Sequence, residues 1–73
     1  MSDTPTAPRS IGADYPHQLA RCRELLEQYE NIGPAGSFGA LHIRNTIDYA
    51  KKAKSSGDVV MMVRAYALMQ EVE

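Results

Sequence analysis

The chain of 73 residues carries 8 basic and 9 acidic side chains, which suits one small domain and excludes any strong overall attraction to nucleic acid or anionic membranes. Cys22 is the only cysteine, so no disulfide forms within the chain, and Cys22, His17 and His42 lack the paired spacing of zinc ligands. We therefore expect no metal and no cofactor. Since so small a domain is marginal alone, oligomerisation is the remaining source of additional core.

The first 14 residues hold two prolines, small polar side chains and one large aliphatic residue, Ile11. This composition buries too little apolar surface to offset the entropy lost on ordering. The sequence therefore predicts a flexible tail over residues 1–14 and a single helical domain over residues 15–73. No apolar run approaches the roughly 20 residues of a membrane span, and no stretch is typical of a secretory signal, so we expect a cytoplasmic protein.

A first helix is predicted over residues 15–31, with Asp14 as its N-cap. Apolar residues follow one face of it at helical spacing, namely Leu19, Cys22, Leu25, Leu26 and Tyr29. Gly33 and Pro34 end the helix, because glycine accepts a left-handed backbone and proline cannot continue the helix.

A second helix is predicted over residues 38–54, capped by Ser37. Its inner face is formed by Ala40, Ile43, Ile47 and Ala50. The short segment 55–57 leads to Asp58, the predicted cap of a third helix over residues 59–73, so the last two helices should form an antiparallel hairpin. The predicted fold class is therefore all-α, with a short helix followed by a helical hairpin.

The third predicted helix has an apolar sector wider than the ~100° stripe of an ordinary surface helix. The second helix can cover one side of this sector and the first helix part of the rest, and the surplus requires another chain, either a second copy or a target. We therefore expect a homodimeric helical bundle whose seam, also a candidate partner interface, consists of Val59, Met62, Val63, Tyr66 and Met69. The alternative is a three-helix bundle within one chain, with the third helix at its centre.

No group of residues indicates catalysis. Cys22 falls on an apolar stripe, which favours an inert buried thiol. Gly33, Gly36 and Gly39 follow no strand, so their spacing favours a turn between helices over a phosphate-binding loop. We therefore expect a protein that is not an enzyme. Binding of a small nucleotide signal would need a polar pocket at the dimer seam, and no residues indicate one.

Two further groups of residues bear on binding. An aromatic patch on the second helix consists of Phe38, His42 and Tyr49. It is a candidate second recognition surface, and ordinary packing against the first helix is the alternative.

A basic group, consisting of Arg44, Lys51, Lys52 and Lys54, leaves DNA binding as an alternative function. The lysines gather at the end of the second helix, however, whereas recognition helices read bases mainly through their first residues.

The connector GPAGSFGA (33–40), the turn SGDVV (56–60) and the acidic end share a pattern with known proteins. With YPHQLARCRELLEQYENI before the connector, most of residues 15–73 resembles short early-gene helical proteins of transposable, Mu-like bacteriophages. This group includes a small dimeric inhibitor that binds a quorum-sensing transcription regulator and a type IV pilus assembly ATPase.

The resemblance implies a phage-encoded protein-binding module that acts in the host bacterial cytoplasm. It would inhibit or redirect a host protein such as a quorum-sensing transcription regulator or a pilus assembly ATPase. A small DNA-binding regulator of phage transcription is the alternative. The shared motifs are structural, so no binding residue is carried over from the family.

Overall fold

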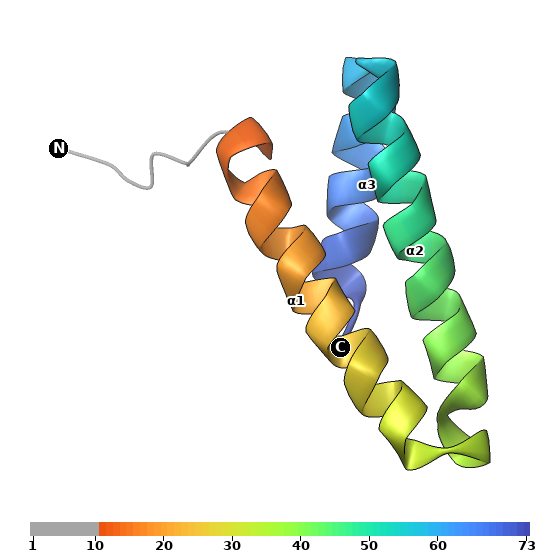
Figure 1. Ribbon diagram of the computed structural model, residues 1–73. Helices are drawn as coiled ribbons and strands as arrows, with labels where there is room; N and C mark the ends of the chain where they lie inside the picture. Colours follow the sequence, from red (N-terminus) through yellow and green to blue (C-terminus); the bar gives the residue numbers. More distant parts are fainter. Residues whose placement is uncertain (1–10) are drawn as a thin grey trace, which may run out of the picture.

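The computed structural model describes residues 11–73, and all the regular secondary structure in this part of the chain is helical (Figure 1). The elements are α1 (Ile11–Ile32), the short 3₁₀ helix η1 (Pro34–Gly36), α2 (Ser37–Ser56) and α3 (Val59–Glu71). α2 runs in the direction opposite to α1 and α3, and each α-helix contacts the other two. The all-α prediction is confirmed, and the three helices pack as a bundle within one chain.

α1 begins at Ile11, so the expectation of a start at Tyr15 with Asp14 as its cap is wrong. Asp14 lies in the first turn of α1, where its carboxylate accepts a hydrogen bond of 2.6 Å from the hydroxyl of Tyr66 in α3. Ile11 itself packs against the core. These distant contacts order a turn that composition alone placed in the predicted tail. Residues 1–10 of that tail lie outside the described residues.

Local signals at the ends of α1 and α2 and at the start of α3 agree with the sequence. Gly33 follows α1 with a φ of 90°, and Gly57 ends α2 with a φ of 73°, both in the left-handed region that glycine adopts without a clash. The carboxylate of Asp58 accepts a hydrogen bond of 3.2 Å from the backbone N–H of Met61. Asp58 therefore caps α3 as predicted, because it satisfies one of the N–H groups that a first turn leaves without a helical partner.

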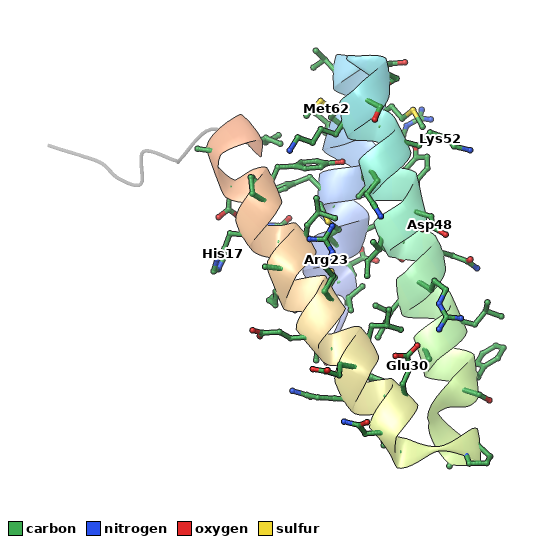
Figure 2. All side chains as sticks on the ribbon, viewed as in Figure 1. His17, Arg23, Glu30, Asp48, Lys52 and Met62 are labelled. Atoms are coloured by element: carbon green, nitrogen blue, oxygen red, sulfur yellow. The ribbon has the colours of Figure 1, made fainter. Side chains whose placement is uncertain are left out.

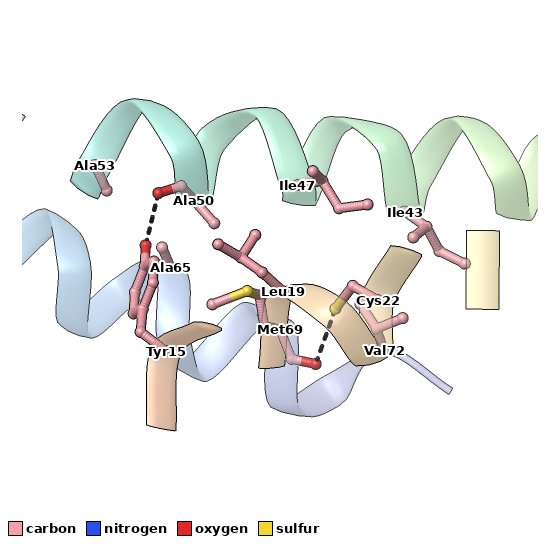
Figure 3. Close-up of a cluster of buried hydrophobic side chains, with 10 residues drawn as sticks. All are labelled: Tyr15, Leu19, Cys22, Ile43, Ile47, Ala50, Ala53, Ala65, Met69 and Val72. Carbon is pink, nitrogen blue, oxygen red and sulfur yellow. Dashed lines mark hydrogen bonds between the residues drawn. The ribbon is translucent and has the colours of Figure 1, made fainter. Parts of the chain in front are cut away.

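The core lies where the three helices meet (Figure 3). Its buried members are Tyr15, Leu19 and Cys22 of α1, Ile43, Ile47, Ala50 and Ala53 of α2, Ala65 and Met69 of α3, and Val72 after it. The alanines have no side chain beyond Cβ, which allows neighbouring helix backbones to approach closely. The Tyr15 hydroxyl donates a hydrogen bond of 2.8 Å to the carbonyl of Ala50, so the one polar atom of this buried ring is satisfied.

Polar side chains of α1 hold the end of α3. The guanidinium of Arg21 donates hydrogen bonds to the backbone oxygens of Met69 and Val72, the latter at 2.8 Å. Met69 lies in the last turn of α3, where its carbonyl also accepts the backbone N–H of Val72 at 3.2 Å, and Val72 directly follows the helix. The carbonyl end of a helix is the negative end of its dipole, so a cation is favourable there. The hydroxyl of Tyr29 donates to the backbone oxygen of Glu73 at 2.7 Å. α1 therefore covers a second side of α3, beside the side that α2 covers.

Candidate protein-binding surfaces

The outer side of α3 exposes a row of aliphatic residues. Val59, Val60 and Val63 are 71%, 61% and 45% exposed, and Ala67 is exposed beside them. Residues 59, 63 and 67 follow one another at a spacing of four, so they lie along one side of the helix, with Val60 adjacent. We call these four residues the α3 face. A row of apolar residues without a partner is typical of interaction surfaces.

The structure divides the five residues of the predicted seam. Val59 and Val63 are exposed on the α3 face, whereas Met62 and Tyr66 are half-buried and pack against the core. Met69 is completely buried between the helices of its own chain, so its assignment to an interface is corrected. The physical reason is that α1 covers this side of α3.

The sequence did not single out Val60 and Ala67, which complete the exposed row. The seam was placed on one side of a wide apolar sector, but α1 and α2 cover part of that side and leave its outer edge exposed. Figure 2 shows Met62 at the end of the bundle where α1 and α3 diverge. Only the position of α1 separates the covered residues from the exposed ones, and no local pattern encodes that position.

A second apolar surface lies on the outer side of α2. Phe38 is 85% exposed, and together with Leu41, His42 and Asn45 it lines a shallow groove of about 230 Å³. We call this the α2 groove. The structure therefore brings together Phe38 and His42 of the predicted aromatic patch. Tyr49, the third member, does not line the groove and is half-buried against the core.

Glycines explain why Phe38 points outward. A Cβ atom on Gly39 would lie 2.5 Å from the ring carbons of Tyr29, and one on Gly36 would lie 2.3 Å from the carbonyl oxygen of Tyr29. Tyr29 therefore occupies the inner side of this connector, and Phe38 is left on the outer side. Ser37 does not cap α2 as expected. Its hydroxyl donates to the carbonyl of Pro34 at 2.9 Å, because η1 leads directly into α2 and Gly36 takes the N-cap position.

The residues considered for chemistry are separated in the structure. His17 is exposed on α1, far along the chain from His42 in the α2 groove. Cys22 is buried, and its thiol donates a weak hydrogen bond of 3.8 Å to the carbonyl of Met69. Burial raises the pKa of this thiol, an effect that nearby Arg21 partly opposes, so Cys22 is a protonated core residue at neutral pH. Within residues 11–73, no three His, Cys, Asp or Glu side chains gather as metal ligands would.

Exposed lysines gather at one end of the bundle and acidic residues toward the other, where Arg44, the fourth member of the basic group, is paired with Glu30. Lys51, Lys52 and Lys54 are exposed near the end of α2, whereas acidic residues, among them Glu27 and Glu30, follow the second half of α1. Figure 2 shows Lys52 at one end and Glu30 at the other. The lysines thus lie at the carbonyl end of their helix, which is not the end that recognition helices present to bases, and this placement does not favour the DNA alternative.

None of the three helices in the described range has both the length and the apolar character needed to cross a membrane. Comparison of the chain with protein-family models, with curated protein sequences and with solved structures finds no match.

Proposed function

We propose that this chain is a protein-binding module without catalytic activity, which pairs with a second copy of itself and occupies the surface of another protein. The α3 face is the observation that carries the proposal. It leaves three valines largely exposed on a helix whose other sides already contact α1 and α2. The core of a single chain does not use these side chains, so a partner gives them a physical role.

Burial of the α3 face would add to a small core. Covering an exposed valine side chain completely is worth about 1.5–3 kcal/mol, and domains of this size have little stability in reserve. A homodimer would bury the same valines on both copies, because a two-fold axis brings identical patches together. This supports self-association through α3 as the first of the two interactions.

The α2 groove is a second surface that remains available in such a dimer. It lies near the beginning of α2, whereas the α3 face lies toward the beginning of α3, at the opposite end of the bundle (Figure 1). Phe38 offers an exposed aromatic anchor, the kind of side chain that carries binding energy when it enters a pocket of a partner. We assign the α2 groove to the recognition of a different protein.

The resemblance to early proteins of Mu-like phages supports a bacterial host protein as this partner. A quorum-sensing transcription regulator and a pilus assembly ATPase are the specific candidates, and the site of action would be the host cytoplasm. The module would act by covering a functional surface of its target, which requires no reactive group of its own.

Two measurements test the two interactions separately. Light scattering across a concentration series from about 1 μM to 1 mM should show the mass rising from one copy to two. A mass of one copy throughout this range would contradict the pairing.

Capture from a bacterial lysate tests recognition through the α2 groove. A host protein retained by the tagged chain should be lost with Phe38→Glu and kept with Leu68→Glu. Leu68 is a matched control, since it is a 41% exposed apolar residue outside both surfaces. Retention by Phe38→Glu equal to that of the unchanged chain would refute this use of the groove.

A further inference from the structure

We propose that two copies pair through their α3 faces in antiparallel orientation, with the two-fold axis beside Val63. This inference rests on the proposed homodimer and specifies which residues meet. The occupant of the α3 face is therefore a second copy of the chain and not a helix of another protein.

The spacing of the exposed residues is self-complementary about Val63. Val60 lies three residues before it and Ala67 four residues after it, and these two positions fall on the same side of Val63 around the helix. Val59 lies four residues before Val63 and Tyr66 three residues after it, and these two positions fall together on the other side of Val63. A two-fold axis perpendicular to α3 then sets Val60 against Ala67 of the second copy, and Val59 against Tyr66 of the second copy.

This register pairs larger with smaller side chains. Val60 meets the single methyl group of Ala67 of the second copy, which lets the two helix backbones approach. Val59, which is 71% exposed, meets the half-buried ring of Tyr66 of the second copy. Val63 meets its own equivalent at the axis. The contact contains no charged side chain, so pairing removes no ion from water.

Charge complementarity favours the antiparallel orientation. The end of α3 carries Glu71 and is followed by Glu73. Its beginning lies beside the end of α2, where three exposed lysines, Lys51, Lys52 and Lys54, outnumber the capping carboxylate of Asp58. Antiparallel pairing brings the acidic end of each copy to the basic end of the other. Parallel pairing would bring like charges together and would also align the two helix dipoles unfavourably.

The size of the face predicts a weak pair. α3 has only 13 residues. The surface that each copy would bury in such a pair is smaller than the ~800 Å² per partner of a standard stable interface. We therefore expect dissociation in the micromolar range and rapid exchange of copies. Exchange of this kind makes mixing experiments practical.

A charge exchange at Val63 tests the axis directly. Val63→Glu and Val63→Lys each place two like charges against each other at the axis, so each variant alone should lose self-association by more than about tenfold. An equimolar mixture should restore the two-copy mass, because Glu then faces Lys. Val63 is half-exposed, so both variants should keep the helical circular dichroism of the parent chain. A mixture that stays at the one-copy mass, or a Val63→Glu variant that pairs normally, overturns the proposed axis.

Single cysteines distinguish the two orientations. Under mild oxidation, Val63→Cys should give a disulfide-linked dimer, whereas Val59→Cys should not, because antiparallel pairing separates residue 59 from its equivalent by about 12 Å along the axis. The parent chain is the control, since its own Cys22 is completely buried and should not cross-link. Cross-linking of Val59→Cys overturns the antiparallel register but leaves the proposed homodimer intact. A parent chain that stays at the one-copy mass in light scattering overturns both.

Discussion

The hydroxyl of Tyr66 donates a hydrogen bond of 2.6 Å to the carboxylate of Asp14, which joins α3 to the first turn of α1 across 52 residues of sequence. Asp14 is nearly buried and also accepts a hydrogen bond from the side chain of Gln18 at 3.4 Å. Together with the buried packing of Tyr15, Leu19 and Cys22, this contact joins α1 to one side of α3. The position of α1 leaves the opposite part of the apolar sector of α3 exposed.

Replacing Tyr66 with Phe should destabilise the fold by about 1–2 kcal/mol, because a buried carboxylate loses one of its hydrogen bonds while the ring still packs. Urea unfolding followed by circular dichroism measures the change. Tyr29→Phe is a suitable control, since it removes an exposed hydrogen bond to the backbone of Glu73, and its effect should be smaller. Equal losses for the two variants would argue against a special role for the contact between α1 and α3.

Arg21→Ala should destabilise the protein by about 1–3 kcal/mol, because two backbone oxygens at the end of α3 lose a charged donor. The matched control is Arg23→Ala, which removes the same charge from an exposed position on the same helix and should change stability by less than about 0.5 kcal/mol. Thermal unfolding of both variants provides the comparison. Similar melting temperatures for the two would show that the end of α3 does not depend on this guanidinium.

Gly39→Ala should destabilise the bundle by about 1–3 kcal/mol, because the added methyl group would lie 2.5 Å from the Tyr29 ring and the helices would have to shift. Gly12→Ala is the control, since a Cβ there meets nothing within 4 Å inside α1, and it should be neutral or stabilising by up to about 1 kcal/mol. Denaturant midpoints of both variants test the difference. A neutral Gly39→Ala would mean that Tyr29 does not pack tightly on the connector.

Alkaline pH should weaken the fold through Cys22 and Tyr15. Burial raises the pKa of Cys22 above its ordinary value of 9.0 and that of Tyr15 above 10.0, the latter also through its neighbour Tyr49. Each group keeps its proton more firmly when folded than when unfolded. The stabilisation that each protonated group contributes is therefore fully present below the ordinary pKa of the group. It is lost as the pH rises from that value toward the raised pKa of the folded state.

The free energy of unfolding, measured in urea at a series of pH values, should therefore be steady near neutrality and fall above about pH 9. Cys22→Ala should remove the first part of this decline. A free energy that rises over the same interval would contradict the assignment of these two groups.

The sequence predicted the elements that depend on neighbouring residues. Gly57 and Asp58 end one helix and begin the next through local backbone geometry and a local hydrogen bond, so their pattern was sufficient. The first turn of α1 contains Asp14, which bonds to Tyr66 52 positions away, and no local signal contains that contact.

The sequence indicated only part of each candidate surface, because the boundary of each surface depends on contacts between distant residues. A wide apolar sector on α3 was visible in the sequence, but its division into buried Met69 and exposed Val60 depends on where α1 packs. Phe38 was singled out from the sequence and is exposed in the structure, whereas Leu41 and Asn45, which line the same groove, were not singled out because neither residue type is distinctive on its own.

Comparing the masses of Val63→Glu and Leu68→Glu in solution tests most directly the claim that two copies pair through the α3 face. The two variants place the same charge on apolar residues of α3 that are 45% and 41% exposed. Light scattering at a concentration where the parent chain forms pairs should give one copy for Val63→Glu and two copies for Leu68→Glu. Two copies for both variants, or one copy for the parent chain at every concentration, would contradict pairing through the α3 face.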